Sequence, residues 1–233
     1  MAAEFNKISI KSVKDAFIDE ILHKIISGEL EPGDRLPPER ELAAALGISR
    51  SIVNQGLLQL ESMGFVAIRP RHGTVVCDFR KYPTPQSLDA LMRYGSSDIG
   101  DPLFSDMMEF RILLERECAG LACENAYDST LDKMEEQLLR MEAGPEDTAD
   151  AQYLFHYRLT QASGNSVYSM IFRAFEPVIR ALIQLHYDLV PSDWKDAAAM
   201  HRRLLEALRR KDKASAQTLC TEIISHGIDV IRK

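Results

Sequence analysis

Residues 37–76 read PPERELAAALGISRSIVNQGLLQLESMGFVAIRPRHGTVV, and this stretch decides the fold of the first part of the chain. Pro37 and Pro38 suit the first turn of a helix, because proline lacks a backbone N–H and its φ is already near the helical value. Gly47 stands where a left-handed C-cap would end that helix, and Ser49 is a good N-cap for the next one. The stretch therefore predicts two helices joined by a tight turn.

A β-hairpin and a further helix are predicted beside these two helices. Two short β-rich runs, residues 66–69 and 74–77, surround Pro70-Arg71-His72-Gly73 and predict a hairpin with a basic tip. Before the stretch, residues 13–26 have an amphipathic stripe that predicts a further helix. Three helices and a β-hairpin wing make a winged helix-turn-helix, a fold that sets one helix into the major groove of DNA.

The second helix of this motif has the side chains that such a role requires. Arg50, Ser51, Asn54 and Gln55 lie on its free face near the N-terminus. Arginine can bind guanine with two hydrogen bonds, and asparagine or glutamine can pair with adenine in the same way. These residue types predict base contacts at the start of the helix.

The charge distribution agrees with a DNA-binding first part. The chain has 233 residues and a net charge of −7, and the acidic excess belongs to its second half. Within residues 35–81 there are seven Lys and Arg (35, 40, 50, 69, 71, 80 and 81) against four Asp and Glu (39, 41, 61 and 78). This region is locally positive, as phosphate binding requires.

Residues 37–42, Ser49-Arg50 and His72-Gly73-Thr74 resemble the GntR family of bacterial transcription regulators, over roughly residues 10–80. The resemblance implies that four residues contact DNA in the major groove, namely Arg40, Ser49, Arg50 and Ser51. It also implies that His72 and Gly73 reach the minor groove. Asn54 departs from the family, which usually has arginine there. Either base preference shifts toward adenine, or this contact is lost.

The rest of the chain is organised differently. We assign residues 1–80 to the winged domain. We assign residues 81–102, which are rich in proline and small polar residues, to a linker in which one short helix is expected. Residues 103–233 show no strand pattern, and six helical segments are expected, at about 103–126, 129–143, 147–163, 166–188, 192–210 and 212–232. The predicted fold class is mainly α, with a C-terminal all-α bundle of six to seven helices.

The helical part resembles the FCD domain of FadR-type GntR regulators, which binds an effector and dimerises. The resemblance is carried by three sets of residues: Glu109-x-Arg111-x3-Glu115; Phe155-His156 with residues 162–165; and His201 with Leu204-Leu205 and Asp212. Many FCD domains bind Zn, Ni, Fe or Mn through an Asp and three His. His156 and His201 stand at two of these positions. Gln152 replaces the Asp, Ile223 replaces the third His, and His226 follows one helical turn later.

Three interpretations of these residues stay open. His156, His201 and His226 could be metal ligands; these histidines, together with Gln152, could contact an effector directly; or the histidines could be hydrogen-bonded core groups. Arg111 is the candidate for binding the carboxylate of an effector, which would be an organic acid or an acyl compound. The alternative role for Arg111 is a buried ion pair with Glu109 or Glu115.

The sequence thus predicts a dimeric transcription regulator, a repressor, that binds a palindromic double-stranded operator and responds to a small metabolite. The alternatives are a ligand-blind regulator whose helical domain only dimerises, and a metal-dependent enzyme fused to a DNA-binding module. We predict no enzyme, because no catalytic motif is recognisable.

No apolar run approaches the roughly 20 residues of a membrane helix, and no secretory signal is present, so we expect a cytoplasmic protein. The four cysteines (Cys77, Cys118, Cys123 and Cys220) are expected as reduced, buried residues.

Overall fold

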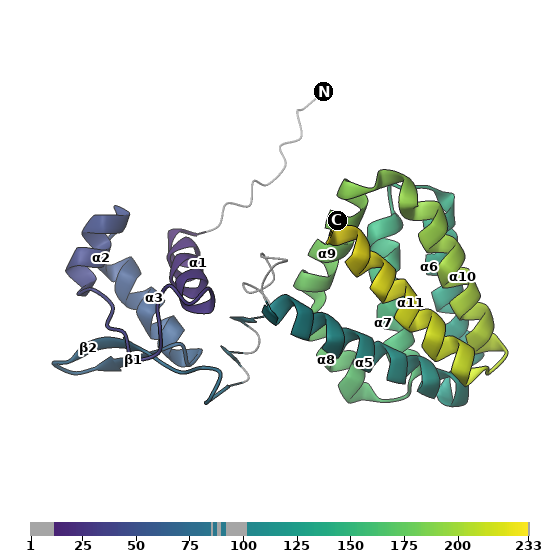
Figure 1. The fold of residues 1–233 in the computed structure, drawn as a ribbon, viewed down its shortest axis with the longest axis horizontal. Helices are drawn as coiled ribbons and strands as arrows, with labels where there is room; N and C mark the ends of the chain where they lie inside the picture. Colours follow the sequence, from purple (N-terminus) through teal and green to yellow (C-terminus); the bar gives the residue numbers. More distant parts are fainter. Residues whose placement is uncertain (1–11, 85, 88–89, 92–101, 233) are drawn as a thin grey trace, which may run out of the picture. The chain divides into compact units, whose positions relative to one another are not determined.

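The computed structural model describes residues 12–84, 86–87, 90–91 and 102–232. The chain forms two compact units, Met1–Gly95 and Ser96–Lys233, and each is described here by itself (Figure 1). The division between them lies within the segment that we assign to the linker. In that segment the described residues Gln86, Ser87, Ala90 and Leu91 are helical.

The first unit has the three predicted helices, α1 (Val13–Ile26), α2 (Glu39–Leu46) and α3 (Arg50–Ser62). The Oγ of Ser12 accepts the backbone N–H of Asp15 at 3.1 Å and begins α1. Gly47, with φ at +67°, ends α2, and the Oγ of Ser49 accepts the backbone N–H of Ile52 to begin α3. The cap residues therefore set the tight turn between α2 and α3.

The wing is an antiparallel pair of strands, β1 (Val66–Arg69) and β2 (Gly73–Val76), paired from Val66 opposite Val76 to Arg69 opposite Gly73. The segment before α2 adds to its edge, because the backbone N–H of Leu36 donates to the carbonyl of Thr74 at 2.9 Å. Phe65 and Val66 are buried at the base of the hairpin. The hairpin is thus anchored at its base, and its tip is exposed.

Gly56 lets α3 approach α1 closely. A Cβ atom at this position would lie 2.3 Å from Cδ1 of Phe17, a core residue of α1 that is 3% exposed. Packed atoms do not come this close, so any larger residue must displace the aromatic ring.

We expect Gly56→Ala to destabilise the winged unit by about 1–2 kcal/mol. Overpacking costs roughly 1–3 kcal/mol, and the better helix propensity of alanine offsets part of that cost. Urea denaturation followed by circular dichroism measures the effect, with the exposed Gln55→Ala as the control. A Gly56→Ala variant as stable as the wild type would show that α1 and α3 are not packed this closely.

The second unit contains seven α-helices among the residues that the structure describes: α5 (Pro102–Asn125), α6 (Asp128–Ala143), α7 (Thr148–Ala162), α8 (Ser166–Ala174), α9 (Glu176–Leu189), α10 (Trp194–Arg209) and α11 (Lys213–Ile231). A 3₁₀ turn, η2 (Pro191–Asp193), precedes α10. The single helix predicted for 166–188 is wrong, because α8 and α9 meet at Phe175. Pro177 occupies the first turn of α9, where its missing N–H is tolerated, but it cannot continue α8.

Several residues of the FCD-like pattern have structural roles at helix ends. The Oδ1 of Asn165 accepts the backbone N–H of Val167 at 3.0 Å and caps α8, and Asp212 caps α11 through the backbone N–H of Ser215. Gly164 has a φ of +76°, which favours glycine. These residues determine where α8 and α11 begin.

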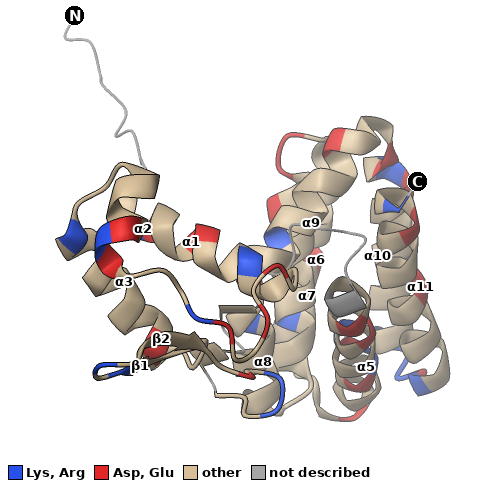
Figure 2. Cartoon of the chain, turned by 60° about the vertical axis from the view of Figure 1, so that its left-hand side comes forward, with Lys and Arg blue, Asp and Glu red and all other residues tan. Residues whose placement is uncertain are grey.

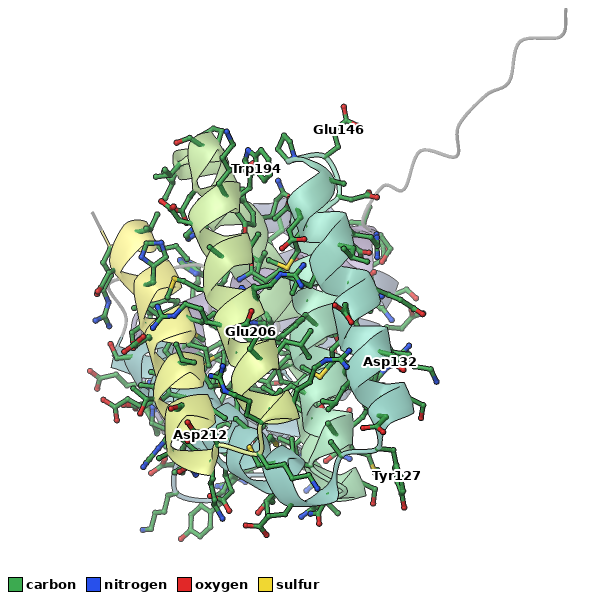
Figure 3. All side chains as sticks on the ribbon, turned by 90° about the vertical axis from the view of Figure 1, so that its right-hand side faces the viewer. Tyr127, Asp132, Glu146, Trp194, Glu206 and Asp212 are labelled. Carbon is green, nitrogen blue, oxygen red and sulfur yellow. The ribbon has the colours of Figure 1, made fainter. Side chains whose placement is uncertain are left out.

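The bundle helices pack around one interior. The helix α11 packs against α5, α9 and α10, and α7 packs against α5, α6, α8 and α9. Figure 3 shows α11, α10 and α6 side by side, with Asp132 on α6. Arg209 on α10 bridges to Asp132 at 3.1 Å and Glu135 at 2.6 Å on α6. Such exposed pairs orient neighbouring helices but contribute little stability.

Within the described part of the chain, no helix is both long enough and apolar enough to cross a bilayer. All four cysteines are free thiols, and three of them (Cys118, Cys123 and Cys220) are buried, as predicted. Cys77 differs from the prediction because it lies half-buried at the end of the wing.

Candidate functional site

The surface predicted to contact DNA is exposed and lies around the start of α3. Ser49, Arg50, Ser51 and Asn54 are exposed there, and so is Arg40 on α2. Arg50 is the first residue of α3, where the N-terminal end of the helix dipole attracts phosphate or a base acceptor. The local structure therefore presents the predicted contact residues together.

Asn54 has a partner that the sequence did not reveal. Its Nδ2 atom donates a hydrogen bond to Oε1 of Glu39 on α2 at 2.9 Å. One of the two amide N–H groups is therefore used within the protein, which leaves one N–H and the oxygen Oδ1 for a contact with adenine. The side chain of Glu39 thus orients Asn54 within the surface that is predicted to contact DNA.

The tip of the wing carries basic residues, as Figure 2 shows at the end of the β1–β2 hairpin. His72 and Gly73 lie at this tip and are exposed, as expected for groove contacts. The backbone N–H of His72 donates to the carbonyl of Arg69 at 3.0 Å, and Arg71 has a φ of +66°. This φ is unfavourable for a side chain other than glycine or asparagine. The sequence had not singled out Arg71 as a separate contact residue, and its backbone conformation makes it a candidate for one.

We expect Arg71→Gly to stabilise the winged unit by about 1 kcal/mol, because glycine adopts the left-handed conformation freely. The same change is expected to weaken DNA binding, since a charge is lost from the wing tip. Thermal denaturation and fluorescence anisotropy with duplex DNA measure the two effects. Unchanged DNA affinity would exclude Arg71 from the interface.

The interior of the second unit contains a buried chain of charged and polar side chains. The Nε of Arg111 on α5 lies 2.6 Å from Oε1 of Glu115, and Oε2 of the same carboxylate contacts Nδ1 of His156 on α7. The Nε2 of His156 lies 3.2 Å from Nε2 of His201 on α10. Glu115, His156 and His201 are fully buried.

The proton positions in this series of buried side chains follow from its last member, His201. The Nδ1 of His201 lies 2.6 Å from the carbonyl oxygen of Ala197, which can only accept, so Nδ1 carries the proton. A neutral His201 then accepts at Nε2, and His156 donates to it. On the other side of its ring, Nδ1 of His156 contacts the carboxylate of Glu115. The buried series therefore runs from the Arg111 guanidinium through the Glu115 carboxylate and His156 to His201.

The surroundings support this assignment. Burial opposes the charged form of Glu115, but the charges of His156 and Arg111 outweigh it and lower the pKa of this carboxyl to about 2. Burial, together with the charge of His156, lowers the pKa of His201 to about 3. Glu115 is therefore ionised and His201 neutral near pH 7. Of the two roles open for Arg111, the structure contains the ion pair with Glu115.

The structure does not bring the three predicted metal ligands together. His156 and His201 meet, but the Oε1 of Gln152 accepts the hydroxyl of Tyr187 at 2.5 Å, and Ile223 has no donor atom. Two imidazoles already bonded to each other, with a neutral amide, are a weak donor set for a divalent ion. The set that the FCD resemblance implies therefore does not fit a metal in this chain.

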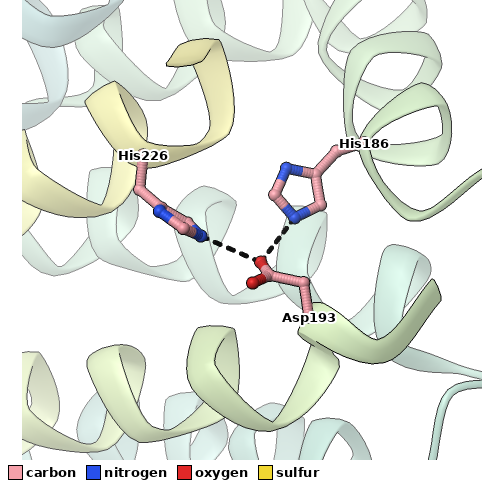
Figure 4. Close-up of side chains that lie close together, drawn as sticks. All are labelled: His186, Asp193 and His226. Atoms are coloured by element: carbon pink, nitrogen blue, oxygen red, sulfur yellow. Dashed lines mark hydrogen bonds and ion pairs between the residues drawn. The ribbon is translucent and has the colours of Figure 1, made fainter. Parts of the chain in front are cut away.

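The third predicted ligand, His226, lies in a different cluster (Figure 4). Its Nε2 is 3.0 Å from Oδ2 of Asp193, and the Nε2 of His186 on α9 is 2.7 Å from the same oxygen. Among the described residues, this is the one group of three His, Cys, Asp or Glu whose ligand atoms all lie within 4.8 Å of one another. No spacing in the sequence predicts this cluster, because its three residues come from α9, η2 and α11.

A cavity of about 30 Å³ lies beside the buried chain. Its polar lining residues are Arg111, Gln152 and His186. The remainder is apolar: Met108, Leu182, Ile183, Ile223, Ile224, Gly227, Ile228 and Ile231. A cavity of this volume holds one or two water molecules. The predicted effector residues Arg111 and Gln152 thus line one cavity.

Known protein families match both units of the chain. Residues 14–76 match the model of the gntR family of bacterial regulatory proteins, and residues 106–226 match that of the FCD domain. The Uxu operon transcriptional regulator of Escherichia coli is 31% identical over 204 residues, which cover 83% of this chain and 76% of that protein. The HTH-type transcriptional regulator LutR of Bacillus subtilis is 33% identical over 146 residues, covering 61% of this chain and 64% of LutR.

Solved structures share the fold. The Listeria monocytogenes protein Lar has a TM-score of 0.62 at 19% identity, covering 97% of this chain and 99% of that chain. McbR/YncC of E. coli has a TM-score of 0.54 at 20% identity, covering 96% and 98%. The family matches agree with the exposed residues at the start of α3 and in the wing. The chain belongs to the gntR family of bacterial regulatory proteins and is a DNA-binding transcription regulator with an FCD domain.

Proposed function

We propose that the protein is a cytoplasmic repressor that binds a palindromic operator as a homodimer, and that a small effector bound in the helical unit releases it. The observation that carries the proposal is the exposed start of α3, where Arg50 can reach base edges while Arg71 and His72 present the wing to DNA. One such unit reads a half-site, and two units related by a two-fold axis read half-sites about one helical turn apart.

The effector would bind at the cavity lined by Arg111, Gln152 and His186. The guanidinium of Arg111 uses its Nε atom on Glu115, and its planar fork offers further donors to a carboxylate. The cavity wall is otherwise aliphatic, which suits the carbon skeleton of the same molecule. These features favour a small organic acid over a polyphosphate or a bulky acyl compound.

The small volume of the cavity supplies a mechanism for release. An effector larger than two water molecules must separate α9 from α11, which form most of the cavity lining. A ligand that binds only the separated arrangement shifts the population toward it. If this arrangement places the two winged units at a spacing that the operator does not fit, effector binding weakens DNA binding.

A thermal-shift screen tests the effector proposal, using hydroxy acids, keto acids and sugar acids. Trp194, the single tryptophan of the chain, starts α10 and reports unfolding of the helical unit by its fluorescence. We expect one acid to raise the melting temperature of the wild type and to weaken operator binding in fluorescence anisotropy. Arg111→Lys keeps the charge beside Glu115 but removes the fork, so both responses should weaken in this variant.

A second candidate function is favoured by the same small cavity. The bundle could only dimerise, with Arg111, Glu115, His156 and His201 as a satisfied interior chain. In that case no acid shifts the melting temperature, operator binding is unaffected by every compound, and the Arg111→Lys variant still binds DNA as the wild type does. That pattern would contradict the effector proposal and leave DNA binding intact.

A further inference from the structure

The side chains of His186, Asp193 and His226 form a cluster that the function described above does not use. His186 is 6% exposed and Asp193 is 9% exposed, so a carboxylate is buried with two imidazoles directed at one of its oxygens. Figure 4 shows both rings pointing toward Asp193 from separate helices. In the described part of the chain, the side chain of Asp193 pairs with these two histidines.

We propose that His186, Asp193 and His226 form a binding site for a divalent transition-metal ion, distinct from the positions of the FCD pattern. Two imidazoles and one carboxylate are a donor set that suits Zn, Fe, Ni or Mn, and they leave coordination positions for water or a small anion. None of the three residues belongs to the set Gln152, His156, His201 and Ile223, which lacks two of its four ligands.

The distances between the three ligand atoms suit a bound metal ion. Metal–ligand bonds of about 2.0–2.2 Å place neighbouring ligand atoms roughly 3–3.5 Å apart in octahedral or tetrahedral geometry. The two Nε2 atoms lie 2.7 and 3.0 Å from Oδ2 of Asp193, and all three ligand atoms lie within 4.8 Å of one another. An ion can therefore replace the two hydrogen bonds through small side-chain rotations, without moving a helix.

The protonation change is simple. Without an ion, each Nε2 donates to the carboxylate and so carries a proton. To ligate, each ring must present a lone pair at Nε2, and its proton moves to Nδ1 or, from an imidazolium, to solvent. The ion then places its positive charge directly beside this buried carboxylate. The site is accessible, because the side chain of His226 is 38% exposed.

The position gives the ion a structural consequence. His186 lies on α9 and His226 on α11, and both helices line the cavity; His186 itself is one of its lining residues. Asp193 joins them from the turn that begins α10. A bound ion would tie α9, α10 and α11 together at one end of the cavity.

Equilibrium dialysis against Zn²⁺ tests the proposal on the full chain, purified without an affinity tag and stripped with a chelator. Metal per chain is measured by mass spectrometry, and folding of each variant is checked by circular dichroism. We expect close to one equivalent in the wild type and in the control His23→Ala, whose exposed histidine lies on α1. We expect at least a tenfold lower occupancy in His226→Ala, which changes a half-exposed side chain, and in the isosteric Asp193→Asn.

A second readout uses stability. Zn²⁺ should raise the melting temperature of the wild type and of His23→Ala but not that of the two site variants. Absence of Zn²⁺ from the wild type would overturn the proposal, and so would one equivalent retained in both His226→Ala and Asp193→Asn. Neither result concerns operator binding or organic acids, so the metal site and the proposed function can fail independently.

Discussion

Arg50→Ala is expected to abolish specific operator binding while leaving the protein folded and its assembly unchanged. Arg50 is exposed at the first position of α3, where a side chain reaches base edges in helix-turn-helix proteins. A bidentate contact between arginine and guanine contributes about 1–3 kcal/mol, and two half-sites double it to roughly 2–6 kcal/mol. Fluorescence anisotropy should therefore show a loss of affinity between about 30-fold and 10⁴-fold.

The stability of this variant should not fall. A positive charge at the N-terminal end of a helix is unfavourable with the helix dipole, so its removal costs nothing there. The charge-matched control is Arg116→Ala, an exposed arginine on α5 in the other unit, which should bind the operator as the wild type does. An Arg50→Ala variant with an unchanged footprint would show that α3 is not the recognition helix.

The second large effect is expected at Glu115, the centre of the buried chain. Glu115→Gln leaves the charge of Arg111 without its counterion in the interior and removes the carboxylate that contacts His156. Breaking a buried pair in this way costs about 3–5 kcal/mol. Urea denaturation followed by the fluorescence of Trp194 measures the loss in the helical unit, and Glu117→Gln, exposed on the same helix, serves as the control. Equal stability of both variants would contradict the charge assignment.

The same chain predicts acid sensitivity. The pKa of Glu115 is lowered to about 2, below the unfolded value of roughly 4.3, and the pKa of His201 is lowered to about 3, below roughly 6.5. In both cases the unfolded chain binds protons that the folded chain does not. The stability that these two groups contribute is therefore full above about pH 6.5 and decreases as the pH falls toward 2. The carboxyl part of this decrease should be missing in Glu115→Gln.

The winged unit could be predicted closely because its signals are local. Gly47 and Ser49 act through their own backbone conformation and their immediate neighbours, so their roles follow from residue type and spacing. The break between α8 and α9 was also encoded locally, by Pro177, but the continuous apolar pattern of 166–188 concealed it. Element boundaries of this kind depend on single residues.

The interior of the second unit could be predicted only in part. The pairing of Arg111 with Glu115 was among the sequence alternatives, because residues four apart share a helix face. The cluster of His186, Asp193 and His226 was not foreseen, since its members are up to 40 positions apart and meet only through the packing of α9 and α11. The contact of Asn54 with Glu39 depends in the same way on how α2 packs against α3.

In vitro selection of duplex DNA from a random pool tests the central claim most directly. The full chain is expected to enrich a sequence with two half-sites related by two-fold symmetry and spaced by about one helical turn. Arg50→Ala should enrich no consensus, whereas Arg116→Ala should enrich the sequence selected by the wild type. A wild-type pool without a symmetric consensus, or an unchanged consensus with Arg50→Ala, would contradict recognition by α3 in a dimer.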